Sequence, residues 1–291
     1  MRAHAVLLAS VLGLALAAGC GESGDGEREA EQAREPAPAD AVAAAAKTTS
    51  ERRTARIAFD ATMEISGLAE PVNFAGEGAA DFATGDSRLT LDMSEFAEAF
   101  GGGLGDPAGW RGDAVYAGDV IYMRLPALAK LLPGAKRWLK IDEGMLMEQG
   151  GTQFSAPDPV EFVQFLEAAG RDVEVLGEDE VRGVTTTHYR ATIDVDELPR
   201  AVAPDARTEV EAYARRLRQM GVEEIPLQTW VDEDGVARRM RVEYDNMQAN
   251  GRSADVAFSL ELFDLGAPVR IDLPPTSQVS DFEALLRGVQ K

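Results

Sequence analysis

Residues 54–66, with the sequence TARIAFDATMEIS, alternate between apolar and polar side chains almost without a break. Successive side chains of an extended chain point to opposite faces, so Ile57, Phe59, Ala61, Met63 and Ile65 share one face. The charged and hydroxyl side chains between them share the other face. This pattern predicts a strand that is buried on one side and solvated on the other, as in antiparallel sheets.

The same kind of pattern recurs along the rest of the chain. Further strands are expected at residues 72–84, 88–93, 111–116, 120–125, 137–142, 173–177, 184–194, 226–232, 236–245, 254–264 and 269–273. Tight turns such as Thr84–Ser87 suit antiparallel neighbours. Pro274 and Pro275 are expected to end the sheet, and a short helix is expected near residues 281–287.

Two amphipathic helices interrupt the strands. One follows Asp158, which suits a helix N-cap, and it carries Phe162, Phe165 and Leu166 on one stripe. The other covers residues 206–220. Because no internal linker divides the strands, one domain is expected, either two packed sheets or one curled sheet whose concave apolar face is covered by helices.

A short helix over Ser94–Phe100 leads into a glycine-rich stretch at residues 101–107. This stretch is either a mobile flap that carries Phe96 and Phe100, or a surface loop.

The N-terminus has the features of a secretory signal peptide. The apolar run Ala5–Ala18 is too short to span a membrane, and small residues follow it up to Cys20, the only cysteine. This arrangement resembles the bacterial lipoprotein signal box, whose cysteine becomes the first mature residue and is acylated, for example with palmitate. Ala17 stands where that box usually has leucine, and an ordinary cleaved signal peptide is the alternative. We therefore expect residues 1–19 to be removed and Cys20 to anchor the chain to the outer face of the cytoplasmic membrane.

Residues 20–50 are rich in Gly, Glu, Ala and Pro, and we expect a flexible tether that precedes a folded domain at 51–291. The alternative is an N-terminal helix over Ala41–Lys47 docked on the domain.

The charge of the chain narrows the choice of partners. The net charge of −21 becomes −22 when Arg2 leaves with the signal peptide. So acidic a protein repels nucleic acid and anionic lipid head groups, and nucleic-acid binding is not expected.

The residues of catalysis and metal binding are scarce. After signal cleavage His188 is the only histidine, and it falls on the polar face of a predicted strand. A zinc site needs more His or Cys ligands, and nucleotide-binding loops are missing from the sequence. The acidic run at Asp232–Gly235 fits a hairpin turn better than a calcium loop. We expect no catalytic residues, no metal and no cofactor.

Several segments together resemble one family. They are 58–63, 119–124, 137–142, the helix after Asp158, 183–189 and 227–232. With the signal box and the tether, they are similar to lipoproteins of the LolA-like superfamily, in particular its actinobacterial LppX/LprAFG group. The resemblance implies a mainly β (α+β) fold: a single curled, half-open antiparallel β-barrel of about 11–12 strands, with two or three amphipathic helices over its concave apolar face.

By the same resemblance, the concave face binds the acyl chains of a lipid, glycolipid or lipoprotein. Methionines and aromatic residues suit such a site because they adapt to irregular apolar ligands. The candidate cavity residues are Phe59, Met63, Phe74, Leu91, Met93, Phe162, Phe165, Leu166, Tyr189, Met240, Phe258 and Leu260.

These observations favour a membrane-anchored lipid carrier or chaperone. The first alternative is a sensory or protein-interaction lipoprotein of the same fold, like the RseB-type regulators, with an envelope protein as its partner. It predicts a small or collapsed cavity and a sizeable exposed apolar patch. A secreted hydrolase is the third class, and it requires His188 to lie in a cleft with an acid and a nucleophile.

Overall fold

The computed structural model describes residues 36–99, 103, 105–142, 159–168, 172–201, 207–249 and 251–289. They belong to one compact unit that begins at Pro36. The predicted signal peptide, Cys20, the first part of the predicted tether, Phe100 and Asp158 lie outside the described residues.

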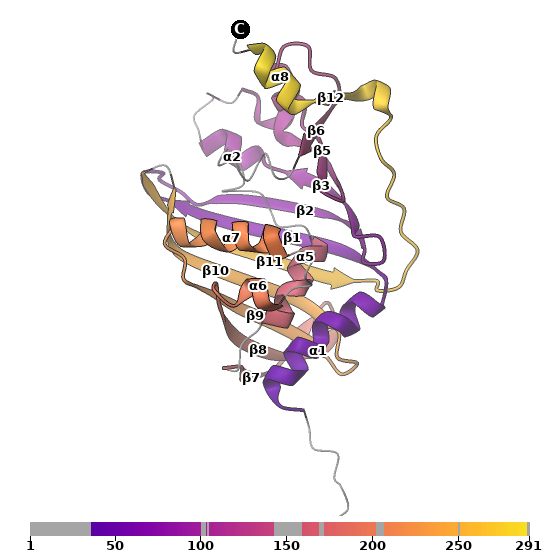
Figure 1. The fold of residues 1–291 in the computed structure, drawn as a ribbon, viewed down its shortest axis with the longest axis vertical. Coiled ribbons are helices and arrows are strands. Elements are labelled where there is room, and N and C mark those ends of the chain that lie inside the picture. Colours follow the sequence, from indigo (N-terminus) through magenta and orange to yellow (C-terminus); the bar gives the residue numbers. More distant parts are fainter. Residues whose placement is uncertain are drawn as a thin grey trace, which may run out of the picture. The chain divides into compact units, whose positions relative to one another are not determined.

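One sheet of twelve strands dominates this unit (Figure 1). Its strands are β1 (Thr54–Ile65), β2 (Val72–Asp81), β3 (Asp86–Asp92), β4 (Arg111–Ala117), β5 (Val120–Arg124), β6 (Trp138–Asp142), β7 (Glu174–Val181), β8 (Val184–Asp194), β9 (Glu224–Asp232), β10 (Ala237–Ala249), β11 (Arg252–Phe263) and β12 (Val279–Asp281). Their order is β12-β6-β5-β4-β3-β2-β1-β11-β10-β9-β8-β7. Two meanders, β1–β6 and β7–β11, are thus joined through the antiparallel pair of β1 and β11. The prediction of one curled, mainly antiparallel sheet is confirmed, and the alternative of two packed sheets is wrong.

Glycines on β2 and β4 permit the curl of the sheet. A Cβ atom on Gly78 would lie 1.8 Å from the carbonyl oxygen of Arg88, and one on Gly112 would lie 1.8 Å from that of Arg124. At Gly76 the nearest atom would be a ring carbon of Phe59, at 2.2 Å. No other residue fits these positions without movement of a neighbouring strand or ring, so neighbouring strands approach more closely here than side chains allow.

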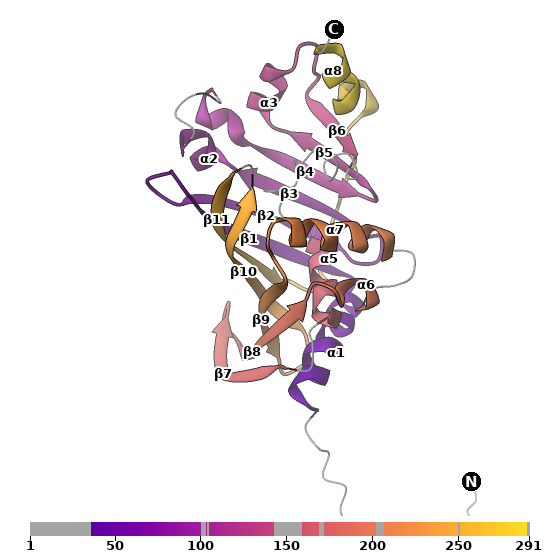
Figure 2. The same cartoon turned by 60° about the vertical axis from the view of Figure 1, so that its left-hand side comes forward.

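Helices cover the inner side of the curl (Figure 2). The helical elements are α1 (Pro38–Glu51), α2 (Ser94–Ala99), η1 (Pro107–Trp110), α3 (Pro126–Leu131), α5 (Pro159–Gln164), η3 (Phe165–Ala168), α6 (Leu198–Ala201), α7 (Arg207–Gln219), η4 (Thr276–Gln278) and α8 (Phe282–Val289). Helices α5 and α7 lie over the central strands, α1 and α6 lie toward the β9 side, and α3 and α8 lie at the β6 end of the sheet (Figure 2). The helices predicted at 94–100, after Asp158, at 206–220 and near 281–287 are all present, whereas α3 and α6 had no predicted counterpart.

Helix α1 shows that the second half of the predicted tether is folded, which corrects the predicted boundary at residue 50. Val42, Ala45, Ala46 and Thr49 are buried, with the spacing of one helical face. The three apolar side chains belong to the main core cluster. The alternative of a docked N-terminal helix is therefore correct for this segment. Its small alanine side chains allow the helix to pack closely in the core. The folded unit thus begins before residue 51.

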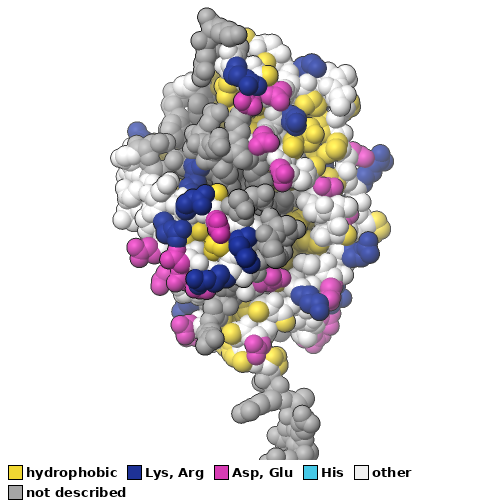
Figure 3. All heavy atoms as spheres, in the orientation of Figure 1, with side chains coloured by type: hydrophobic (Ala, Val, Ile, Leu, Met, Phe, Trp, Pro, Cys, Tyr) yellow, Lys and Arg dark blue, Asp and Glu magenta, His cyan; other side chains and the backbone are white. Residues whose placement is uncertain are grey.

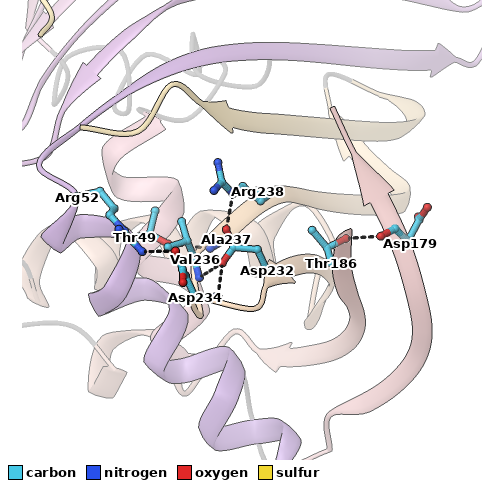
Figure 4. Close-up of polar contacts among 9 residues, drawn as sticks. All are labelled: Thr49, Arg52, Asp179, Thr186, Asp232, Asp234, Val236, Ala237 and Arg238. Carbon is cyan, nitrogen blue, oxygen red and sulfur yellow. Dashed lines mark hydrogen bonds and ion pairs between the residues drawn. The ribbon is translucent and has the colours of Figure 1, made fainter. Parts of the chain in front are cut away.

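Polar contacts fix α1 to the turn between β9 and β10 (Figure 4). The buried Thr49 Oγ1 accepts a hydrogen bond from the Ala237 amide at 2.9 Å, and Arg52 forms an ion pair with Asp234 at 3.1 Å. The Asp232 carboxylate accepts hydrogen bonds from the amides of Asp234 and Val236 and is ion-paired with Arg238. The predicted hairpin turn at Glu233–Gly235 is thereby confirmed.

The C-terminal end of the sheet differs from the prediction in two ways. Residues 269–273 do not form a strand, and Leu273 is exposed. Strand β11 already has β1 and β10 as neighbours, so the chain that follows has no free edge to join at that point. Beyond Pro274 and Pro275 it reaches the edge strand β6, where β12 pairs in parallel. The sheet is therefore mixed, and the prolines do not end it.

Candidate functional site: the concave face of the sheet

Side chains that alternate along single strands become continuous apolar rows across the sheet. Phe59 of β1 lies opposite Leu260 of β11, which lies opposite Met240 of β10. In the next row Ala61 lies opposite Phe258, and Phe258 lies opposite Val242. Paired residues of an antiparallel ladder project on the same side. The sequence pattern of β1 thus extends over several strands as one apolar surface.

An aromatic cluster lies at the centre of this surface. The rings of Phe59 and Phe258 stack with their centroids 5.9 Å apart. Phe162 of α5 meets Phe258 edge-on at 5.0 Å. Phe162, Val163 and Leu166 are fully buried. The helix that follows Asp158 therefore places its apolar stripe directly on the sheet, as its sequence predicts.

The predicted cavity residues separate into two groups. The main core cluster contains Phe59, Leu91, Phe162, Leu166, Met240, Phe258 and Leu260, with Tyr189 packed against it and half-buried. Met63 and Phe74 belong to a second cluster, against which Met93 and Phe96 pack. The side chain of Phe165 lies outside the described residues.

The second cluster lies under α2. The ring of Phe96 lies 5.6 Å from that of Phe74 and 6.3 Å from that of Trp110. Phe96, which the sequence places on a possible flap, thus packs against β2 and η1.

The concave face also includes side chains that sequence reasoning did not select. Val42 and Ala45 of α1, Leu217 of α7, and Ile225 and Leu227 of β9 are fully buried in the main cluster. The periodicity of residues 206–220 and the possible helix at 41–47 were the available signals. Neither indicated which strands these helices would cover.

One polar pair lies among these apolar groups. Tyr244 of β10 is hydrogen-bonded to Tyr213 of α7. Burial raises the pKa of the Tyr244 hydroxyl well above its ordinary value, and Tyr213 raises it further. The Tyr244 hydroxyl therefore stays uncharged at neutral pH, and its hydrogen bond attaches α7 to the sheet.

The described side chains of the concave face are buried against one another and against the helices. Two hollows, of about 300 and 340 Å³, are formed by described residues, and both lie elsewhere. The first lies at the turns after β1 and β10, between residues 64–71 and 253–255. The second is on the solvated face around Asp60, Trp230 and Arg241. Since the predicted cavity residues contact one another and the helices, a ligand would have to displace part of the helical cover.

His188 lies on the solvated face of the sheet, opposite to the concave face. Its ring stacks on Trp230 with a centroid distance of 4.0 Å, and its Nε2 lies 2.9 Å from Gln228 Oε1. Trp230 Nε1 donates to Asp179 at 2.9 Å, and this hydrogen bond lowers the pKa of the Asp179 carboxyl. These contacts assign His188 a packing role beside Trp230.

Other features of the described residues can be stated briefly. They include no cluster of His, Cys, Asp and Glu side chains that could hold a metal ion. None of the described helices is long and apolar enough to cross a membrane. Charged side chains of both signs are interspersed on the helix-covered side (Figure 3). The exposed large apolar side chains are Leu131, Val175 and Leu273, from three separate segments.

Fold and site together define a class of protein: a curled one-sheet β domain whose apolar concave face is closed by short helices. No protein-family profile matches the chain. It is 28% identical over 199 residues to an uncharacterized 31.2 kDa protein from the rplA–rplJ intergenic region of Streptomyces griseus. That match covers 64% of this chain and 63% of the relative, so the chain spans less than two thirds of the relative's length.

Two solved structures that are similar to the chain are mycobacterial lipoproteins. The lipoprotein LppX of Mycobacterium tuberculosis is 12% identical with a TM-score of 0.45, and the match covers 80% of this chain and 99% of LppX. LprF from Mycobacterium bovis is 14% identical with a TM-score of 0.40, covering 81% of this chain and 96% of LprF. These similarities concern the fold.

Proposed function

We propose that this protein is a membrane-anchored, extracytoplasmic lipoprotein that binds the acyl chains of a lipid, glycolipid or lipoprotein on its concave face and carries or chaperones them. The observation that carries the proposal is the continuous apolar face across β1, β10 and β11, which is covered by separate short helices instead of a second sheet. Separate helices can be displaced one at a time, whereas a packed sheet cannot.

The segment α5–η3 is the best candidate for the part that moves. It is a short helix that continues directly as a 3₁₀ turn, and it places Phe162 on Phe258. Exposing Phe162 and Leu166 costs roughly 1.5–3 kcal/mol each, and each acyl methylene that enters contributes about 0.8 kcal/mol. An entering chain of about ten methylenes therefore offsets the displacement of both side chains.

In this proposal Cys20 carries the lipid anchor. The tether that the sequence predicts between Cys20 and α1 corresponds to a root-mean-square reach of roughly 20–25 Å. The domain then works close to the outer face of the cytoplasmic membrane.

The test uses the chain from residue 36 to 291, because α1 is part of the core and a later start would remove it. The protein is purified from a lipid-producing host and analysed by native mass spectrometry and solvent extraction. A discrete added mass that extracts as lipid is expected. A clean apo mass, together with failure to take up added lipids, would contradict the proposal.

Two phenylalanine variants locate the site. Phe162→Ala removes the ring that covers Phe258, and we expect faster or fuller lipid uptake. Phe96→Ala is the matched control, because it removes the same ring from the separate cluster under α2. Equal uptake by both variants and the unaltered chain would place lipid somewhere other than the part of the concave face that α5 covers.

The burial of the described concave-face side chains is the observation that favours the alternative, a sensory or interaction lipoprotein with a protein partner. The second feature expected of that class, a sizeable exposed apolar patch, has no counterpart in the three scattered exposed side chains of the described residues. If native mass spectrometry found only the lipid-free protein, the protein would be assigned to the sensory or interaction class.

A further inference from the structure

The segment from Arg124 to Lys140 has a charge opposite to that of the protein. Its sequence, RLPALAKLLPGAKRWLK, contains five cations and no carboxylate, in a chain whose net charge is −21. Three of the chain's lysines, Lys130, Lys136 and Lys140, lie within it. A concentration of this kind in so acidic a chain marks a local surface that differs from the average.

The fold gathers these cations at one end of the sheet. Strand β5 ends with Arg124, helix α3 follows, and β6 begins with Trp138. The guanidinium of Arg124 lies 5.7 Å from the centroid of the Trp138 ring. Burial lowers the pKa of Arg124, and the nearby charges of Arg137 and Arg88 lower it further. Three arginines thus lie close enough to repel one another.

Local carboxylates neutralise only part of this charge. Asp113, which is buried, is ion-paired with both Arg124 and Arg88. Lys130, Lys136, Arg137 and Lys140 are exposed, and none of them has an ion-pair partner among the described residues.

An apolar side chain projects among these cations. Leu131, at the end of α3, is 55% exposed. It follows Lys130 directly, and the exposed Pro133 lies between it and Lys136. Exposed leucine beside lysine and arginine is the pattern of protein surfaces that lie in a membrane interface, where the cations meet phosphate groups and the apolar side chain enters the acyl region.

We propose that this surface, the cationic patch of Lys130, Leu131, Lys136, Arg137 and Lys140, docks the domain onto a lipid bilayer that contains anionic head groups. The patch lies at the β6 end of the unit, and α1 starts at the opposite end (Figures 1 and 2). Docking is therefore a second attachment, separate from the predicted N-terminal anchor. It does not depend on lipid binding by the concave face.

The experiment measures vesicle binding by the chain from residue 36 to 291, which lacks Cys20 and any acyl anchor. Sedimentation with vesicles of 30% phosphatidylglycerol in phosphatidylcholine is compared with sedimentation with pure phosphatidylcholine. We expect binding to the anionic vesicles that weakens as salt is added, and little binding to the neutral ones.

The decisive variant replaces Lys130, Lys136 and Lys140 with glutamine. Each lost cation should lower the partition coefficient about fivefold, or roughly a hundredfold for all three. The matched control replaces Arg56, Arg215 and Arg252 with glutamine, three exposed cations outside the patch that also have no ion-pair partner among the described residues. Both variants change the net charge by the same amount. A larger loss of vesicle binding in the lysine variant would therefore show that docking occurs through the patch.

Leu131→Asn tests the apolar contact without changing the charge of the patch, and we expect about a tenfold loss of binding to the anionic vesicles. Circular dichroism of every variant establishes that it is folded. Equal losses in the lysine variant and its control, or no binding of the unaltered chain to anionic vesicles, would overturn the proposal.

Discussion

The two faces of β1 and β11 differ in how far their interactions extend. On the concave face, Phe59 and Leu260 belong to a cluster that includes residues of eight other strands and of the covering helices. On the solvated face, Asp60 and Glu261 interact with a few arginines of neighbouring strands. The concave face is therefore a collective structure, and the solvated face is a set of local pairs. Substitutions on the two faces should differ in size and in their dependence on pH.

The largest difference is expected for truncation of a core side chain. Leu260 is fully buried between Phe59 and Met240. Leu260→Ala should lower the free energy of unfolding by about 2–5 kcal/mol, from lost burial and the cavity that remains. Thr62→Ala, on the solvated face of β1, removes only an exposed hydrogen bond to Asn73 and should cost about 0.5 kcal/mol. Urea denaturation of both variants measures this, and similar costs would mean that the faces are not distinct.

The next prediction concerns the curl that creates the two faces. In Gly78→Ala the new methyl group would meet the Arg88 carbonyl of the neighbouring strand. The strands must separate, and we expect a loss of about 1–3 kcal/mol in unfolding free energy. Gly118→Ala is a control that strains only the turn after β4, since nothing lies near its Cβ position. If Gly78→Ala costs less than Gly118→Ala, close strand approach does not set the curl.

A smaller, pH-dependent effect is expected on the solvated face. Burial alone would raise the pKa of Glu261, but hydrogen bonds and charges from Arg239 and Arg182 lower it overall. Its ionised form therefore stabilises the folded state above the unfolded pKa, and this contribution is lost as the pH falls through the lowered folded pKa. Glu261→Gln should cost about 1–2 kcal/mol at pH 7. Chemical denaturation at several pH values measures the difference, which should shrink in acid, and a constant difference would contradict the ion-pair explanation.

Features that repeat along the chain were predictable from the sequence. Strands such as β1 and β8 bury alternate residues, and alternation is a local signal that tertiary contacts rarely reverse. The stripe of Phe162 and Leu166 likewise indicated the buried face of α5. These two signals yielded the sheet and much of the concave face.

Features that depend on distant partners were not predictable. The alanine-rich α1 has the composition of a linker, and only its contacts with the core distinguish a docked helix from a flexible linker. Strand β12 has three residues and pairs with β6, far away in the sequence. The expected repulsion of anionic lipid was based on the net charge of the whole chain. The net charge is an average over the surface, and it does not indicate the cationic segment at residues 124–140. The pair of Tyr213 and Tyr244 exists only when α7 lies on β10.

The smallest predicted effect concerns Asp60, which lies near Glu261 but titrates in the opposite direction. Burial raises its pKa, and the charge of Glu261 adds to this, while Arg241 and Arg239 oppose it. Because the folded pKa is above the unfolded one, ionised Asp60 weakens the folded state at neutral pH, and this penalty is relieved as the pH falls through the folded pKa. Asp60→Asn should therefore raise the unfolding free energy by up to about 0.5 kcal/mol at pH 7 and by less in acid. Paired denaturation curves at pH 7 and pH 4 would measure both values. A loss of stability at pH 7 would mean that the attraction of Arg241 and Arg239 outweighs burial, and the two carboxylates would then act alike.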